Sequence, residues 1–224
     1  MKYLISLILI VFIQTVQAQI YNRVEASVSI KTKYENGKGT LEMGKIYYDK
    51  KNKKLIYDFS FPEKQTIALF DTTISVIKNG LLIDKQKIAP LLQSTLFNII
   101  LEGELQNYGL RNNPIYKVVK IEKDRDLVIS TWEFKGKNKG LGNILISNKG
   151  KDLNGVVFLN PKGEVISKQL FSQYILVSGI RFPTEITQII IQEKKQIYQV
   201  TTFKNIVVNS LQNAKFYNYI LPRK

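Results

Sequence analysis

Along most of the chain, apolar and polar side chains alternate with a period of two, which is typical of β-strands that bury one face. In the segment 55–61, Tyr57, Phe59 and Phe61 alternate with two polar side chains before Pro62 ends the run. Similar runs recur along the chain, each followed by a short polar or glycine-containing turn. The strands predicted in this way are residues 26–34, 40–48, 55–61, 65–71, 73–77, 115–123, 127–135, 143–147, 155–159, 168–177, 184–192 and 196–208.

Two of the turns contain residue types with a specific backbone preference. Asn79-Gly80 lies between apolar runs, and both residues tolerate the positive φ angles of a tight hairpin. Residues 160–163 read Asn-Pro-Lys-Gly, in which proline presets φ at the second position of the turn. Strands at such regular spacing predict a mainly β fold, an antiparallel meander that closes fully or partly into a barrel.

One stretch has its apolar residues at helical spacing instead. In the segment 88–102 they recur every three or four positions, Pro90 is tolerable in a first turn, and Gly103 suits a C-terminal stop. We therefore predict a helix over 88–102 that caps the sheet. A second, shorter helical turn is predicted near 210–216.

The N-terminus has the organisation of a secretory signal peptide. Lys2 precedes an apolar run over 3–13, and small side chains at Val16 and Ala18 suit cleavage after Ala18. The run is shorter than the ~20 apolar residues that span a bilayer. We expect residues 1–18 to be removed and 19–224 to form one soluble domain, located in the periplasm if the source is a bacterium.

The composition is strongly basic, with a formal charge of +15 that becomes +14 once Lys2 is removed. One interpretation is attraction to an anionic surface such as lipid headgroups. The other is that lysines simply occupy solvent-facing strand positions, which their scatter along the sequence favours. Nucleic acid is not expected as a partner of a secreted chain.

The chain lacks the residues most used for chemistry. It contains no histidine and no cysteine, so disulfides, the usual zinc sites and the commonest general base are excluded. Two carboxylate pairs, Asp124 with Asp126 and Glu102 with Glu104, fall at predicted turns, where charged residues are ordinary. We expect no enzyme, no metal and no cofactor.

Aromatic side chains are the remaining candidates for a functional surface. Most of them lie in or beside predicted strands. Many must form an ordinary core, but a large curved sheet can also leave an apolar hollow suited to an acyl chain. The residues expected to line it are Tyr57, Phe59, Phe61, Phe70, Leu92, Leu96, Ile99, Trp132, Phe158 and Phe171.

Three stretches resemble the LolA-like outer-membrane lipoprotein carriers. They are "GKIYYDKKNKKLIYDFSFPEKQTIALFDTTISVIKNG" over 44–80, "APLLQSTLFNIIL" over 89–101 and "VVNSLQNAKFYNYILP" over 207–222. The resemblance implies an incomplete antiparallel barrel, capped by one or two helices, with an apolar cavity. Such carriers take lipid-modified proteins from an inner-membrane transporter and deliver them to an outer-membrane acceptor.

The chain departs from the family pattern at two places. Where the family has an arginine followed by proline that matters for handing on the cargo, this chain reads Lys50-Lys51, which we carry over as contacts to headgroups or a partner. Where the family begins with an amphipathic helix, residues 19–34 alternate as a strand.

Three hypotheses follow from the sequence. The leading one is a periplasmic carrier that binds acyl chains of lipoproteins or other lipids for transfer towards the outer membrane. The alternative is a non-catalytic envelope module, such as a sensor subunit, that uses the same fold for protein contacts. A secreted hydrolase would need two carboxylates that converge in one cleft.

Overall fold

The computed structural model describes residues 21–70, 72–87, 96–136, 141–192 and 195–222. The expected signal peptide, residue Leu92 and the first part of the predicted helix lie outside the described residues. The described residues form one sheet of thirteen strands, in the order β6-β5-β4-β3-β2-β1-β13-β12-β11-β10-β9-β8-β7. The strands are β1 Arg23–Tyr34, β2 Gly39–Asp49, β3 Lys54–Phe61, β4 Gln65–Phe70, β5 Thr73–Lys78, β6 Leu81–Lys87, β7 Tyr116–Asp124, β8 Leu127–Phe134, β9 Ile144–Lys149, β10 Asp152–Leu159, β11 Val165–Val177, β12 Ile180–Gln192 and β13 Lys195–Val208.

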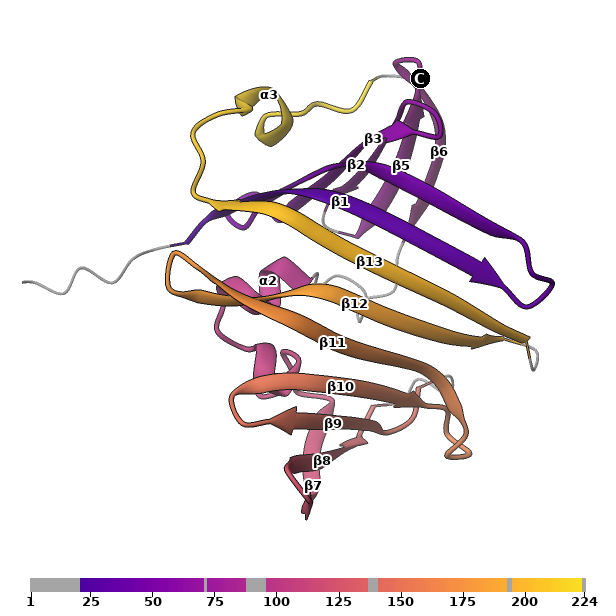
Figure 1. The fold of residues 1–224 in the computed structure, drawn as a ribbon, viewed down its shortest axis with the longest axis vertical. Helices are drawn as coiled ribbons and strands as arrows, with labels where there is room; N and C mark the ends of the chain where they lie inside the picture. Colours follow the sequence, from indigo (N-terminus) through magenta and orange to yellow (C-terminus); the bar gives the residue numbers. More distant parts are fainter. Residues whose placement is uncertain (1–20, 71, 88–95, 137–140, 193–194, 223–224) are drawn as a thin grey trace, which may run out of the picture.

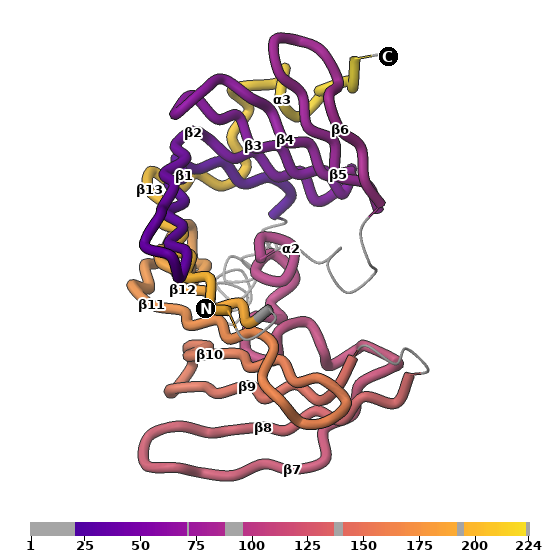
Figure 2. The backbone as a smooth tube through the Cα atoms, turned by 90° about the vertical axis from the view of Figure 1, so that its right-hand side faces the viewer, coloured from indigo at the N-terminus to yellow at the C-terminus, as the bar shows by residue number. Residues whose placement is uncertain are grey.

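Each pair of neighbouring strands is antiparallel, and the sheet stays open between its two edge strands, β6 and β7. The long strands β1, β13, β12 and β11 form its middle (Figure 1). Seen from the side, the sheet bends into a trough with α2, Leu96–Leu101, on its inner side (Figure 2). The predicted mainly β, incomplete antiparallel barrel is therefore confirmed, as are the predicted strands.

Both predicted helical segments contain a helix, but each helix is short. The prediction over 88–102 is confirmed for α2, and Gly103 follows it with φ 71°, a conformation that favours glycine. A 3-10 helix, η2 Leu105–Asn107, continues the connection to β7. The turn predicted near 210–216 is α3, Ala214–Tyr217.

The two faces of the sheet carry different cores. We call the face that packs against α2 the concave face and the other the convex face. On the convex face, Tyr217 covers Tyr47, Ile56, Ala68 and Ile77 of β2 to β5. Phe216 also stacks on Tyr47, with ring centroids 4.1 Å apart. The C-terminal segment thus closes the outer side of this half of the sheet.

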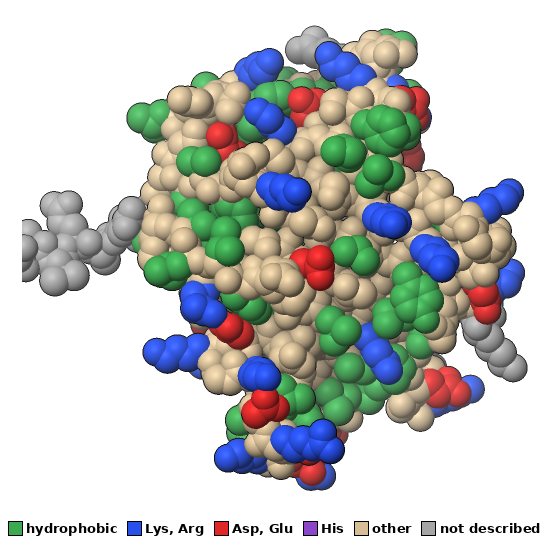
Figure 3. Space-filling view, viewed as in Figure 1, with side chains coloured by type: hydrophobic (Ala, Val, Ile, Leu, Met, Phe, Trp, Pro, Cys, Tyr) green, Lys and Arg blue, Asp and Glu red, His purple; other side chains and the backbone are tan. Residues whose placement is uncertain are grey.

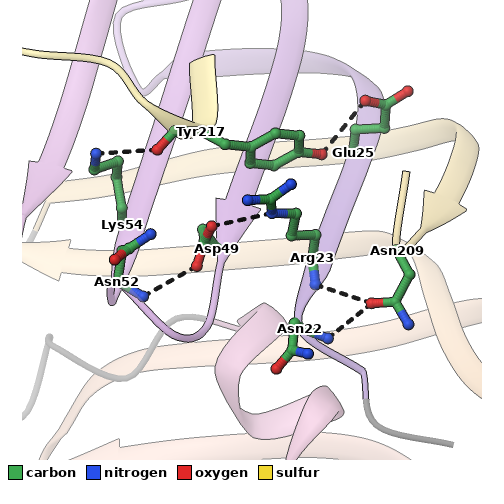
Figure 4. Close-up of polar contacts among 8 residues, drawn as sticks. All are labelled: Asn22, Arg23, Glu25, Asp49, Asn52, Lys54, Asn209 and Tyr217. Carbon is green, nitrogen blue, oxygen red and sulfur yellow. Dashed lines mark hydrogen bonds and ion pairs between the residues drawn. The ribbon is translucent and has the colours of Figure 1, made fainter. Parts of the chain in front are cut away.

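A group of polar contacts joins β1, the β2–β3 turn and the segment that contains α3 (Figure 4). The buried Asp49 carboxylate accepts a hydrogen bond from Arg23 Nε at 3.1 Å and another from the Asn52 N–H at 3.0 Å. Lys54 Nζ donates to the carbonyl oxygens of Tyr217 and Tyr219, each at 3.1 Å.

At two positions another segment of backbone comes so close that only glycine, which has no Cβ, fits. A Cβ at Gly44 would lie 2.2 Å from Asp58 O across the β2–β3 pair, and one at Gly142 would lie 2.2 Å from Asn160 O. Gly142 therefore allows its segment of backbone to approach the one that leads into the 160–163 turn. This is a packing role.

Candidate functional site

The concave face is apolar over the middle of the sheet. Val28 of β1 and Phe203 of β13 stand directly opposite each other, and Phe97 of α2 packs edge-on against Phe203 with ring centroids 5.4 Å apart. Phe97 also stacks on Tyr48 at 6.1 Å, and the Tyr48 hydroxyl donates to Asn98 Oδ1 at 2.7 Å. The helix α2 is thereby fixed against β1, β2 and β13.

A second apolar cluster continues along the concave face beneath η2. It is formed by buried residues of β7, β9, β10 and β11 together with Leu110. Tyr108, just after η2, contacts Phe158 at 5.8 Å and Phe171 at 6.2 Å between ring centroids. Its hydroxyl donates to Gln169 Oε1 at 2.8 Å. The two clusters share Leu96, Leu105 and Ile186, so the apolar lining is continuous.

Most of the residues predicted to line a hollow lie on the concave face. Tyr57 and Phe59 stack on each other with ring centroids 5.6 Å apart and pack with the α2 cluster. Ile99 is buried on α2, where a Cβ at Gly109 would lie 3.6 Å from its Cγ1. The structure brings the following predicted residues together around α2 and η2: Tyr57, Phe59, Leu96, Ile99, Trp132, Phe158 and Phe171.

The structure separates two predicted residues from this group. Phe70 packs in the convex cluster beside the Tyr217 segment, and Lys54 Nζ lies 4.9 Å from its ring centroid. Its strand is apolar on both faces because the C-terminal segment covers the outer one. Phe61 ends β3 opposite Met43 and is half exposed. We therefore leave both out of the lining proposed below, and Leu92 lies outside the described residues.

Lys50 and Lys51 lie in the turn between β2 and β3, near the point where the described chain begins. The backbone N–H of Lys50 donates to Asn22 O at 2.7 Å, and the Lys51 side chain is exposed. Among the described residues, neither ammonium group takes part in an ion pair. Both are therefore available to an outside anion.

The Tyr57 phenol is a polar group that packs with the α2 cluster. Burial raises its pKa from 10.0 to about 12. Within the described part of the chain, its hydroxyl has no hydrogen-bond partner. No hydrogen bond therefore offsets the cost of removing the charged phenolate form from water.

A row of polar side chains that the sequence reasoning missed crosses the concave face. Thr32 of β1, Gln199 of β13, Gln188 of β12 and Gln169 of β11 stand directly opposite one another on successive strands. We call these four residues the carboxamide row. In the sequence they look like ordinary polar positions of alternating strands. The available signal was Gln188, which lies in a segment rich in isoleucine, 186–191.

The two predicted carboxylate pairs lie at different places, one at the β7–β8 turn and the other between α2 and η2, where one carboxylate oxygen of Glu104 is buried. Asp126 lies at the β7–β8 turn and forms an exposed ion pair with Lys149 at 2.6 Å, whose hydrogen bond lowers the pKa of Asp126. Glu102 and Glu104 flank Gly103 at the end of α2, where Asn98 Nδ2 donates to Glu102 at 3.1 Å. No cluster of three metal-ligating side chains occurs among the described residues.

The convex face of the central strands mixes charge and apolar surface. Figure 3 shows Lys and Arg side chains scattered over it, with acidic and hydrophobic groups between them. A shallow hollow of about 450 Å³ lies over β3, β2, β1 and β13, and its lining includes three serines, Lys45, Lys204 and Asp58. The scatter favours the interpretation that lysines occupy solvent-facing positions.

Solved structures share this architecture over most of the chain. A LolA superfamily protein from Nitrosomonas europaea matches 88% of this chain and 90% of its own length, with TM-score 0.61 and 14% identity. An outer membrane lipoprotein-sorting protein domain from Vibrio parahaemolyticus matches 90% and 92%, with TM-score 0.62 and 12% identity. The chain has the LolA-like fold. The fold expected from the resemblance is confirmed.

A third solved structure also matches most of the chain. A DUF1329 family protein from Desulfovibrio piger matches 92% of this chain and 94% of its own, with TM-score 0.54 and 12% identity. No family model and no curated protein matches the sequence. In the described part of the chain, no helix is long and apolar enough to cross a membrane.

Proposed function

We propose that this protein is a periplasmic carrier that binds the acyl chains of lipoproteins or other lipids and moves them towards the outer membrane. The observation that carries the proposal is the continuous apolar concave face of an open LolA-like sheet, with α2 packed against it. An acyl chain placed there would gain about 0.8 kcal/mol for each methylene buried. Binding of this kind requires no catalytic group.

The proposal includes removal of residues 1–18 and folding of 19–224 as one domain. Lys50 and Lys51, at the β2–β3 turn, would contact anionic headgroups or an acceptor protein. Lysine acts there as a point charge. Replacing both with Ala should slow transfer of a lipidated peptide to anionic vesicles while its binding to the carrier stays unchanged.

The test is direct lipid binding by the purified mature protein. Solvent extraction should release bound lipid, and a fluorescent fatty acid should bind and be displaced by unlabelled lipid. Ile186→Asp puts a charge on the concave face and should abolish binding. Thr187→Asp, on the same strand but facing the convex side, is the matched control and should bind normally. Circular dichroism verifies that both variants fold.

A second candidate is a non-catalytic envelope module that uses the fold for protein contacts. It is favoured by the degree to which α2 fills the concave face, since Phe97, Ile100 and Leu101 are all buried against the sheet. Under this hypothesis solvent extraction of the purified protein releases no lipid, and the fluorescent fatty acid does not bind. The protein instead forms a stoichiometric complex with one envelope protein.

A further inference from the structure

The carboxamide row lies within the apolar lining of the concave face. On one side of the row, two residues further along each strand, the opposed residues are Ile30, Thr201, Ile186 and Phe171. Of these, Ile186 and Phe171 belong to the apolar clusters. On the other side the opposed residues include Ile190 and Ile197. A strip of hydrogen-bonding groups therefore runs across four strands between two mainly apolar strips.

The row has hydrogen-bonding capacity left over. Gln199 Nε2 donates to Thr32 Oγ1 at 3.3 Å, and Gln188 Nε2 donates to Ser167 Oγ at 3.5 Å. A carboxamide offers two N–H donors and one oxygen acceptor. Among the described residues, no group donates to the amide oxygens of Gln188 and Gln199. Both side chains can therefore donate to and accept from a ligand.

The lysines in the strand interiors beside the row point away from it, and Lys195, at the start of β13, is the strand-end lysine of β13 on the concave side. In the interiors of β1, β11 and β13, the lysines are Lys31, Lys33, Lys168 and Lys204, and the register places each on the convex face. The charged side chain beside the row is acidic. It is Glu42 of β2, which lies opposite Ile30 of β1 and accepts a hydrogen bond from Gln65 Nε2 at 3.1 Å.

We propose that the row formed by Thr32, Gln199, Gln188 and Gln169 binds the uncharged amide or ester group of an acylated ligand, so that the protein selects acyl amides and esters over free fatty acids. This rests on the proposed function, because it assumes that the acyl chain lies on the concave face. An amide or ester pairs with carboxamides without a counter-ion. A carboxylate there would lose water, would have no lysine at the neighbouring concave positions of the row's own four strands to pair with, and would lie near Glu42.

The experiment measures binding of ligands with the same acyl chain to the mature protein, residues 19–224, at pH 8. The ligands are palmitoylethanolamide, which carries a neutral amide, and palmitate. The amide should bind about tenfold more tightly than the anion, since burying an unpaired carboxylate costs at least that factor. Equal or tighter binding of palmitate overturns the proposal.

Variants then assign the preference to the row. Gln188→Leu and Gln199→Leu should each weaken binding of the amide by about threefold to tenfold, as expected for one lost uncharged hydrogen bond. Gln196→Leu is the matched control, because Gln196 is exposed and accepts its hydrogen bond from Tyr198 on the same strand. If the Gln199 and Gln196 variants behave alike, the row does not recognise the ligand.

Two further readouts separate this proposal from the function on which it rests. Glu42→Gln should increase the affinity for palmitate several-fold and leave the amide unchanged, and no gain for palmitate contradicts the role of charge. An uncharged apolar dye reports on the concave face alone. If neither dye nor lipid binds, the carrier function fails, whereas dye binding with no amide preference overturns only the present inference.

Discussion

At the scale of single residues, the most consequential polar group is Asp49, which is buried yet ion-paired. Its carboxylate is held by Arg23, whose guanidinium also lies 4.5 Å from the centroid of the Tyr217 ring. In the sequence, Asp49 is only the first letter of the polar turn "DKKNKK". Its partner is 26 positions away, and local patterning contains no information about such a pair.

Asp49→Asn should destabilise the fold by about 2 kcal/mol, less than a fully buried pair because Arg23 is partly exposed. The measurement is the urea midpoint at a constant m-value. Asp126→Asn is the control, because its ion pair with Lys149 is exposed, and its midpoint should not move. Equal midpoints for the two variants would show that Asp49 has no such role.

Tyr57 gives the protein an alkaline pH dependence. Because burial raises the folded-state pKa from 10.0 to about 12, the folded protein keeps this proton where the unfolded chain releases it. Its contribution to stability is complete below pH 10 and is lost as the pH rises towards 12. Tyr57→Phe should lose less stability over that window and should remove one late-titrating phenol from the ultraviolet titration. A titration identical to that of the wild type would contradict this.

At the scale of elements, α2 connects the sequence pattern to the site. Its apolar spacing was sufficient to predict a helix, and Gly103 marked its end. The pattern could not show which strands the helix would contact, because Phe97 meets Tyr48 and Phe203 from opposite ends of the chain. The face that Phe70 occupies was unpredictable for a similar reason, since the C-terminal segment makes both sides of β4 apolar.

Phe97→Ala should destabilise the protein by about 3–4 kcal/mol, because it removes a buried ring and leaves a cavity between α2 and the sheet. Chemical denaturation measures the loss. Phe61→Ala removes the same ring from a half-exposed position and should cost far less. A small effect at Phe97 would mean that α2 is not firmly packed on the concave face.

At the scale of the whole molecule, the sheet is long, antiparallel and open, and the sequence predicted this well. Regular strands and turns, together with the LolA-like resemblance, were enough for the architecture. The carboxamide row was not predictable, because only the register of four strands places Thr32, Gln199, Gln188 and Gln169 in line. The same register places Lys31, Lys33, Lys168 and Lys204 on the convex face, so the wall immediately around the row is largely apolar.

The central claim is that an acyl chain occupies the concave face. The most direct measurement is photolabelling of the mature protein with a palmitoyl amide that carries a diazirine near the methyl end, followed by peptide mapping. The account predicts labels on concave residues such as Ile186, Phe203 and Phe97, which unlabelled lipid competes away. Labels confined to convex residues such as Tyr198 and Leu170, or labelling that lipid does not compete away, would contradict it.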